Sequence, residues 1–93
     1  MSRYCIVYTD VYNRRAARFL KRHPTLISQY RKAMSLLELD PFHPSLRLHK
    51  LEGRMSQLHS ISINLSYRVV IHFLIADDEI VPVDIGDHDR VYR

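Results

Sequence analysis

The feature that most constrains the fold of this chain is a change of hydrophobic period near its middle. Before the loop at residues 40–44 most apolar residues recur at helical spacing, whereas after it apolar and polar residues alternate. Ahead of the helical part, residues 3–9 also alternate, with apolar side chains on both sides. This pattern predicts a central strand that holds Cys5 as a buried core thiol.

The resulting order of elements, β-α-α-β-β-β-β, predicts the α+β class. A helical hairpin on one face of a twisted, mainly antiparallel sheet accounts for it. The 93 residues contain no repeat, linker or low-complexity stretch. A chain this short buries only about 60–65% of its unfolded surface and can build one core. We therefore expect a single domain spanning residues 1–93.

Features that the sequence lacks limit the cellular compartment and the kinds of site that we expect. The longest apolar stretch, residues 69–76, is interrupted by His72 and is far too short to span a bilayer. The N-terminus does not resemble a signal peptide, so we expect a cytoplasmic protein without a membrane partner. The single cysteine excludes an intramolecular disulfide, and no His-x-x-x-His pair points to zinc. We expect neither a metal nor a cofactor.

Two helices with clear end signals make up the helical part. Thr9 or Asp10 can cap a first helix that runs to about Arg22. Pro24 starts a second helix, which ends before Pro41. The second helix carries an apolar stripe formed by Leu26, Tyr30, Ala33, Met34 and Leu37. The first carries a basic face that could bind a polyanion or simply be solvated, formed by Arg14, Arg15, Arg18, Lys21 and Arg22.

The alternating part contains four strand candidates, namely Leu46–Leu51, Leu58–Asn64, Tyr67–Ile75 and Glu79–Ile85. Pro82 has no N–H, so it must lie at a sheet edge or at a position without a ladder hydrogen bond. A hairpin that turns at residues 64–66 pairs residues whose numbers sum to about 130. This register turns one set of side chains toward the helices, namely Ile61, Ile63, Val69, Ile71 and Phe73. It turns another set away from them, namely Ser60, Ser62, Arg68, Val70 and His72.

Arg68 stands in a valine-rich strand and needs a partner there, because its charge cannot be left in an apolar layer. One explanation is a structural salt bridge with an acidic neighbour such as Asp84, and the other is a functional role. The net charge of +4, from 14 Lys and Arg against 10 Asp and Glu, favours polyanionic partners but also fits a mildly basic, solvated surface. The location of the charges on the folded protein must decide between a polyanion-binding surface and a solvated one.

The C-terminal half carries an ordered series of short motifs. They read His49-Lys50-Leu51-Glu52-Gly53, Ser60-Ile61-Ser62-Ile63, Tyr67-Arg68-Val69-Val70, Asp84-Ile85-Gly86-Asp87-His88 and Val91-Tyr92. This series resembles the RelE/YafQ branch of the RelE/ParE superfamily of bacterial toxins. The preceding strand and helical hairpin are also the family's arrangement. Each motif is short, but the two Arg- and His-containing runs at this spacing are fairly specific.

The resemblance implies the toxin of a type II toxin–antitoxin system, an endoribonuclease that cleaves mRNA at the ribosomal A site without metal. The ribose 2′-OH attacks the adjacent phosphate in this reaction. A base must take the 2′ proton, an acid must protonate the leaving oxygen, and cations must stabilise the phosphorane. The implied partners are a cognate antitoxin, mRNA and ribosomal RNA.

Motif matches also imply roles for single residues. His88 occupies the family's Gly-x-His position and could act as the general acid, while Arg68 would contact the scissile phosphate. Tyr92 would stack on or orient the nucleotide. His49 could be the base or a phosphate contact, with Lys50 as the cationic alternative, because the parity of that strand leaves open which of them faces the site. The expected substrate-binding residues are Lys50, Arg47, Arg54 and Ser62.

Departures from the family pattern keep other hypotheses open. Ser62 and Ser66 stand where YafQ-like members have a histidine and an aspartate, and the lysines that RelE places on this strand are missing. Tyr92 could instead close the core, and His59 is expected to face the helices in a structural role. The alternatives are a ParE-like, non-enzymatic gyrase inhibitor and a degenerate toxin that only binds its antitoxin. His88 and Arg68 argue against the gyrase inhibitor, which needs no acid beside an arginine.

Overall fold

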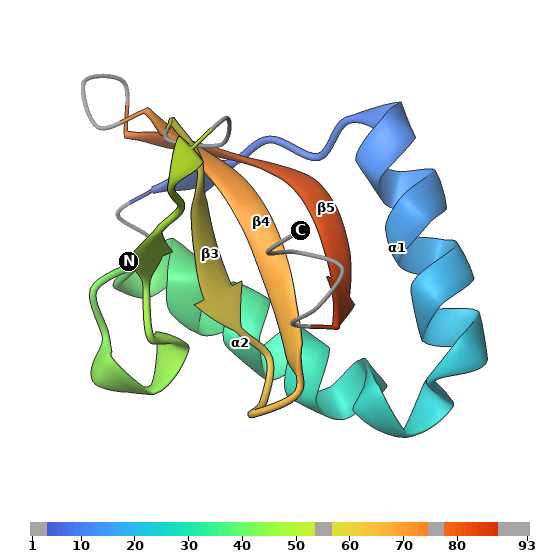
Figure 1. The fold of residues 1–93 in the computed structure, drawn as a ribbon. Coiled ribbons are helices and arrows are strands. Elements are labelled where there is room, and N and C mark those ends of the chain that lie inside the picture. The colour runs from blue at the N-terminus through green and yellow to red at the C-terminus, as the bar shows by residue number, and fades with distance from the viewer. Residues whose placement is uncertain (1–3, 54–56, 75–77, 88–93) are drawn as a thin grey trace.

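The computed structural model describes residues 4–53, 57–74 and 78–87. Within these residues a five-stranded sheet has the strand order β1-β5-β4-β3-β2. Figure 1 shows α2 behind this sheet and α1 alongside β5. The elements are β1 (Cys5–Ile6), α1 (Asp10–Arg22), η1 (Pro24–Leu26), α2 (Ile27–Leu39), η2 (Pro44–Leu46), β2 (His49–Lys50), β3 (His59–Ser62), β4 (Tyr67–Leu74) and β5 (Glu79–Asp87). This succession confirms the predicted α+β class.

Local signals fix most helix ends where the sequence predicts them. The Thr9 side chain accepts a hydrogen bond of 3.1 Å from the backbone N–H of Tyr12 and so caps α1. The start of the second helix differs from the prediction, because Pro24 opens the short 3-10 helix η1 and α2 begins only at Ile27. As predicted, α2 ends before Pro41, at Leu39. No helix of the described residues is long and apolar enough to cross a membrane.

The register of the β3–β4 hairpin is the predicted one. Ile61 pairs with Val69 and Ser62 with Arg68, so the paired numbers sum to 130. The five side chains predicted to face the helices all belong to the main core, together with Tyr12, Ala16, Ala33, Met34 and Leu37 from the helices. The other predicted set, which includes Arg68 and Val70, therefore lies on the opposite face of the sheet, which neither α1 nor α2 covers (Figure 1). Val70 packs there in a second apolar cluster with Leu51.

The prediction of a central first strand is wrong, because β1 is an edge strand of two residues that, among the described strands, pairs with β5 alone, in parallel. Pro82 explains why it is so short. Val7 N–H donates to the Ile80 carbonyl at 2.9 Å, and the next bond of this parallel ladder would need an N–H at residue 82. Ile6 packs on the main core, so Cys5 points to the opposite face of the sheet and is exposed rather than buried.

The predicted strand Leu46–Leu51 is reduced to the two residues of β2. Residues 44–46 form the turn η2 instead, in which His43 Nδ1 accepts a hydrogen bond of 3.2 Å from Ser45 N–H. Arg47 then adopts a left-handed conformation, with φ 49° and ψ 51°. A proline and a left-handed residue both interrupt the extended backbone, so pairing starts only at His49.

Helix α1 covers the part of β5 that β1 leaves unpaired. Its Arg15 Nη1 donates a hydrogen bond of 2.8 Å to the carbonyl of Val83, which lies just beyond Pro82. Its Tyr12 hydroxyl bonds to the hydroxyl of Tyr30 on α2 at 2.9 Å. These two contacts tie the first helix to the sheet edge and to the second helix.

Candidate functional site

Arg68 is the polar centre of the sheet face that the helices leave uncovered. Its Nε donates a hydrogen bond of 3.0 Å to Ser60 Oγ, and its Nη2 donates one of 2.9 Å to the backbone carbonyl of Arg47. Arg68 is only 9% exposed and Ser60 is fully buried. A guanidinium anchored at two nitrogens has a fixed orientation, which is a requirement for directed contacts with a phosphate or carboxylate.

The left-handed turn at Arg47 supplies one of these two anchors. Sequence reasoning expected the Arg47 side chain to bind substrate, whereas the structure shows its carbonyl bound to Arg68 and its side chain exposed. Ser60 supplies the second anchor and was missed as a site residue. The sequence did contain a signal for it, because Ser60 stands two residues before Ser62 and so shares the sheet face of Arg68. There its hydroxyl is within reach of the long arginine side chain.

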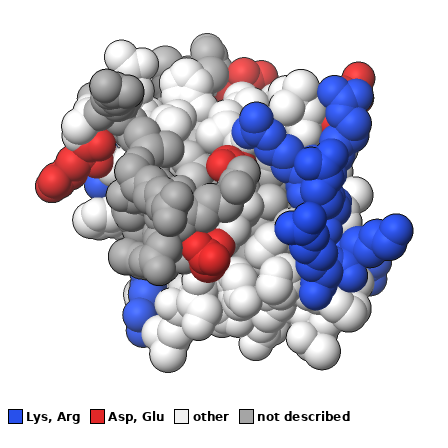
Figure 2. All heavy atoms as spheres, turned by 45° about the vertical axis from the view of Figure 1, so that its right-hand side comes forward, with Lys and Arg blue, Asp and Glu red and all other residues white. Residues whose placement is uncertain are grey.

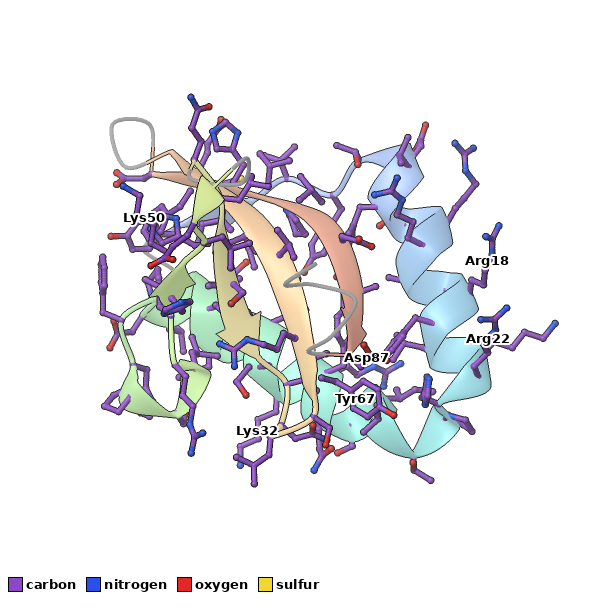
Figure 3. The ribbon with its side chains drawn as sticks, in the orientation of Figure 1. Arg18, Arg22, Lys32, Lys50, Tyr67 and Asp87 are labelled. Atoms are coloured by element: carbon purple, nitrogen blue, oxygen red, sulfur yellow. The ribbon has the colours of Figure 1, made fainter. Side chains whose placement is uncertain are left out.

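The register of β2 decides between His49 and Lys50. His49 pairs with Ser60 and so shares the face of Arg68, where it is exposed. Lys50 pairs with His59, a residue of the helix-facing set, and therefore lies on the opposite face. Figure 3 shows Lys50 at the β2 end of the sheet, far from the labelled arginines of α1. The structure brings His49, and not Lys50, to the side of Arg68.

Two further predicted residues, Ser62 and Asp84, lie close to Arg68 in the sheet. Ser62 is its direct partner on β3, and the Ser62 hydroxyl donates to the carbonyl of Asn64 in the hairpin turn. Asp84, the acidic neighbour considered for a salt bridge, pairs with Val70, and its Oδ1 accepts a hydrogen bond of 2.9 Å from Ile85 N–H. Gly86 is the partner of Arg68 on β5.

His59 faces the helices, as parity predicted. Its ring meets Phe73 edge-on at 5.9 Å between centroids, and its buried Nδ1 has no hydrogen-bond partner in the described structure. Burial, reinforced by the charges of Lys50 and His49, lowers the pKa of His59 below its ordinary value. A neutral ring beside Phe73 fits a structural role.

Three predicted site residues, His88, Tyr92 and Arg54, lie outside the described residues. Among the residues that are described, no group of three or more His, Cys, Asp or Glu side chains could hold a metal ion. The described part of the site is therefore an anchored arginine with an exposed histidine on the same sheet face. It can bind an anion, and the imidazole can take or give a proton.

No protein-family model matches this chain, and no curated protein matches it by sequence. Solved structures do match. YafQ from E. coli strain BL21(DE3) has a TM-score of 0.76 at 14% identity, with 97% of this chain and 99% of that chain covered. An E. coli DinJ–YafQ toxin–antitoxin complex has a TM-score of 0.75 at 13% identity, covering 98% of this chain and 99% of that chain.

The match extends to another toxin–antitoxin complex. RelBE2 from Mycobacterium tuberculosis has a TM-score of 0.67 at 14% identity, with 91% of this chain and 98% of that chain covered. At such identities the likeness concerns the fold, which is the RelE-like arrangement of two helices and a mixed sheet. The resemblance in the sequence motifs predicted the same fold.

Proposed function

We propose that this chain is the toxin of a toxin–antitoxin pair and a metal-independent endoribonuclease that cleaves mRNA at the ribosomal A site. The proposal is carried by Arg68, which lies on the face of a RelE-like fold that α1 and α2 leave uncovered. Ser60 and the backbone carbonyl of Arg47 hold its guanidinium in place. Such an anchored cation suits the charge that develops on a phosphorane, because its donors need no reorganisation during the reaction.

In the proposed mechanism the remaining roles follow the motif matches. His49, exposed on the face of Arg68, takes the 2′ proton or contacts the phosphate. His88 gives a proton to the leaving 5′-oxygen, and it follows directly after Asp87, the last residue of β5. Arg68 itself binds the phosphate, and Tyr92 stacks on the nucleotide.

Arg47, Arg54 and Ser62 are the proposed substrate contacts. Lys50 is not included among them, because it lies on the opposite face of the sheet.

The general acid can be tested by His88→Ala. Loss of proton transfer is expected to lower the cleavage rate by about 10²–10⁴-fold without lowering ribosome binding. Tyr92→Phe should be tolerated and Tyr92→Ala should not, since stacking needs the ring rather than the hydroxyl. Single-turnover cleavage on programmed ribosomes measures all three. Full activity of His88→Ala would assign the acid to another residue.

The reaction class can be tested on translating ribosomes by mapping the ends of the mRNA. Cleavage should persist in the presence of chelators and stop when the residue at the cut carries a 2′-deoxyribose, because the 2′-OH is the nucleophile. Cleavage of the deoxy-substituted RNA would refute the mechanism. Inhibition of DNA gyrase without any RNA cleavage would favour the ParE-like alternative.

The proposed protein partner is a cognate antitoxin. The structural relatives DinJ–YafQ and RelBE2 are toxin–antitoxin complexes, which supports this part of the proposal. Co-expression with the product of the neighbouring reading frame should yield a stable complex without ribonuclease activity. A complex that forms with a chain inactive on ribosomes would instead support the degenerate toxin.

A further inference from the structure

The turn ahead of β2 contains a residue in the left-handed conformation. Outside glycine, Arg47 and Asp78 are the residues with a positive φ in the described part of the chain, and Arg47 has φ 49° and ψ 51°. A long side chain is rarely found in this conformation, because its Cβ crowds the following carbonyl oxygen. Such a residue persists where its surroundings hold it, and strain of this kind clusters at functional sites.

Side-chain and backbone contacts hold residues 43–47, which we call the 43–47 turn. His43 Nδ1 accepts a hydrogen bond of 3.2 Å from Ser45 N–H and lies 2.9 Å from Ser45 Oγ. A backbone bond of 3.0 Å joins Leu46 N–H to the His43 carbonyl. The Leu46 side chain, 1% exposed, belongs to the main core. These contacts fix the turn at its start and in its middle, ahead of Arg47.

The left-handed conformation decides where the Arg47 carbonyl points. The direction of a carbonyl changes with the ψ angle of its own residue, and an extended residue has a ψ of about 135°. At ψ 51° the Arg47 carbonyl is turned by roughly 80° from that direction. In this orientation it accepts the 2.9 Å hydrogen bond from Arg68 Nη2. An extended residue at this position would direct its carbonyl elsewhere.

The bond from Arg47 acts at the outer end of the Arg68 side chain. Ser60 holds the Nε atom, where the planar group begins, and the Arg47 carbonyl holds Nη2 at the far side. Bonds at two separate nitrogens fix the plane of a guanidinium better than one bond does. The plane matters, because a fork of two N–H groups matches a phosphate in one orientation.

We infer that the 43–47 turn is the positioning element of Arg68, and that Arg47 and His43 act on the reaction through it. Arg47 contributes its main chain, by a carbonyl that the left-handed conformation aims at Arg68 Nη2. His43 acts one step further away, by holding the start of the turn. The kinetic part of this inference rests on the function proposed above, in which Arg68 binds the scissile phosphate. The orientation of Arg68 does not.

This role is separable from the substrate contact proposed for the exposed Arg47 side chain. Loss of the side chain removes a cation that meets RNA, so it should raise KM. Loss of the left-handed conformation should lower kcat, since it misplaces a group that acts in the transition state. Figure 2 shows that Lys and Arg side chains gather in a column over α1. Arg47 comes from the turn ahead of β2, so its substitution leaves that column unchanged.

The test compares substitutions of Arg47 that all lack the cation but differ in backbone preference. Gly and Asn tolerate the left-handed conformation, Ala adopts it poorly and the β-branched Val worst of all. Arg47→Asn and Arg47→Gly should raise KM and keep kcat within about threefold. Arg47→Val should lower kcat by about 10–100-fold, and Arg47→Ala, the milder variant if Val prevents folding, by less. Cleavage measured over a range of ribosome concentrations separates the two constants.

Lys50 provides the matched control, because it is extended in β2 and lies on the sheet face opposite Arg68. Val favours a strand and Asn does not. Lys50→Asn and Lys50→Val should therefore not reproduce the advantage of Asn over Val that is expected at Arg47.

A second pair of variants tests His43. His43→Asn keeps an acceptor atom on Cγ, where the imidazole has Nδ1, and should keep kcat. His43→Ala removes the acceptor and should lower kcat by about fivefold, the factor that corresponds to the loss of a typical cap. Equal kcat values for the two variants would overturn the role of His43.

The orientation of Arg68 can be followed by NMR without any cleavage. Its Nε–Hε group, held by the buried Ser60, gives a cross-peak that Arg68→Lys removes and so identifies. The peak should keep its position in Arg47→Asn and His43→Asn and should shift in Arg47→Val, while the methyl resonances of the core stay in place. Equal kcat for Arg47→Asn and Arg47→Val, or an Arg68 peak that does not move in Arg47→Val, would overturn the inference.

The two proposals can fail separately. If the chain cleaves no RNA but the Arg68 peak follows the backbone preference of residue 47, the proposed function is refuted and the positioning of Arg68 stands. If Arg47→Asn and Arg47→Val cleave RNA equally well, the positioning is refuted and the proposed function stands.

Discussion

Arg68 is held by two acceptors from different parts of the chain, Ser60 on β3 and the carbonyl of Arg47 ahead of β2. Neither of these two acceptors carries a charge. The same bonds make the residue structural, because removing a buried donor leaves its acceptors unsatisfied. Activity and stability should therefore be measured together in any variant of this residue.

Arg68→Ala is expected to lower the cleavage rate by about 10²–10³-fold, as loss of a preorganised donor does elsewhere. It should also cost about 1–3 kcal/mol of unfolding free energy, because Ser60 Oγ and the Arg47 carbonyl lose their partner. Arg68→Lys keeps the charge without the planar fork and should recover only part of the rate. Ser60→Ala removes one anchor of the guanidinium, and its cleavage rate should lie between those of the two Arg68 variants. Cleavage on ribosomes and urea unfolding check both effects, and unchanged cleavage by Arg68→Ala would contradict the assignment.

His59 is expected to make the stability of the protein depend on pH. Burial, with Lys50 and His49 nearby, lowers its pKa below the ordinary 6.5, so folding favours the neutral ring. The contribution is present in full above the unfolded-state pKa and is lost as the pH falls from there through the folded-state pKa. His59→Phe should keep the edge-on contact with Phe73 and flatten this decline. Unfolding free energies measured by urea at a series of pH values below 6.5 test it, and parallel curves for the two proteins would contradict it.

At the scale of elements, α1 performs two tasks. Tyr12, only 1% exposed, anchors its apolar side in the core, and Arg15 satisfies a carbonyl of the open β5 edge. Pro82 makes the second task necessary, because it ends the pairing of β1 and leaves this edge without a strand. Among the described elements, a helix rather than a further strand therefore lies beside this part of β5 (Figure 1).

The bond between the hydroxyls of Tyr12 and Tyr30, 2.9 Å long, links the two helices. Tyr12→Phe should destabilise the protein by about 0.5–1.5 kcal/mol, the usual net contribution of a hydrogen bond. Tyr8→Phe is the matched control, since Tyr8 is 47% exposed, and it should change stability by less than about 0.5 kcal/mol. Denaturant unfolding measures both variants, and equal effects would show that the bond contributes nothing to stability.

For the whole molecule, the main core has to hold both helices against the sheet, and a second, smaller apolar cluster contains Leu51 and Val70. At about 0.05–0.15 kcal/mol per residue, a chain of 93 residues has roughly 5–14 kcal/mol of stability. A single well-buried leucine is a large fraction of that amount. The sheet face that carries Arg68 depends on this core for its geometry.

Leu37 and Leu39 provide a matched test of the core, because both lie on α2 while Leu37 is 0% and Leu39 48% exposed. Leu37→Ala is expected to cost about 2–5 kcal/mol through lost burial and a residual cavity. Leu39→Ala should cost less than about 0.5 kcal/mol. Thermal unfolding should remain a single transition in both variants. Separate transitions for helices and sheet would show that the chain does not unfold as one unit.

The sequence alone determined the features that depend on neighbours along the chain. Caps and prolines set the ends of α1 and α2, and the alternation of β3 and β4 put Arg68 on the face away from the helices. The register of this hairpin follows because a slip by one residue would expose its whole apolar set. The motif series also led to the RelE-like fold and to Arg68 and His49 as candidate site residues.

Only the tertiary structure decided the features that depend on partners distant in sequence. Which face each residue of a two-residue strand occupies is set by the strand with which it pairs. Pairing with β3 places His49 on the sheet face of Arg68 and Lys50 on the opposite face. Strand order made β1 an edge and exposed Cys5. The Arg47 carbonyl reaches Arg68 because Arg47 adopts a left-handed conformation, which the hydrophobic period of the sequence does not indicate. Hydrophobic period reports which face a side chain occupies, but not which strand, edge or helix lies beside it.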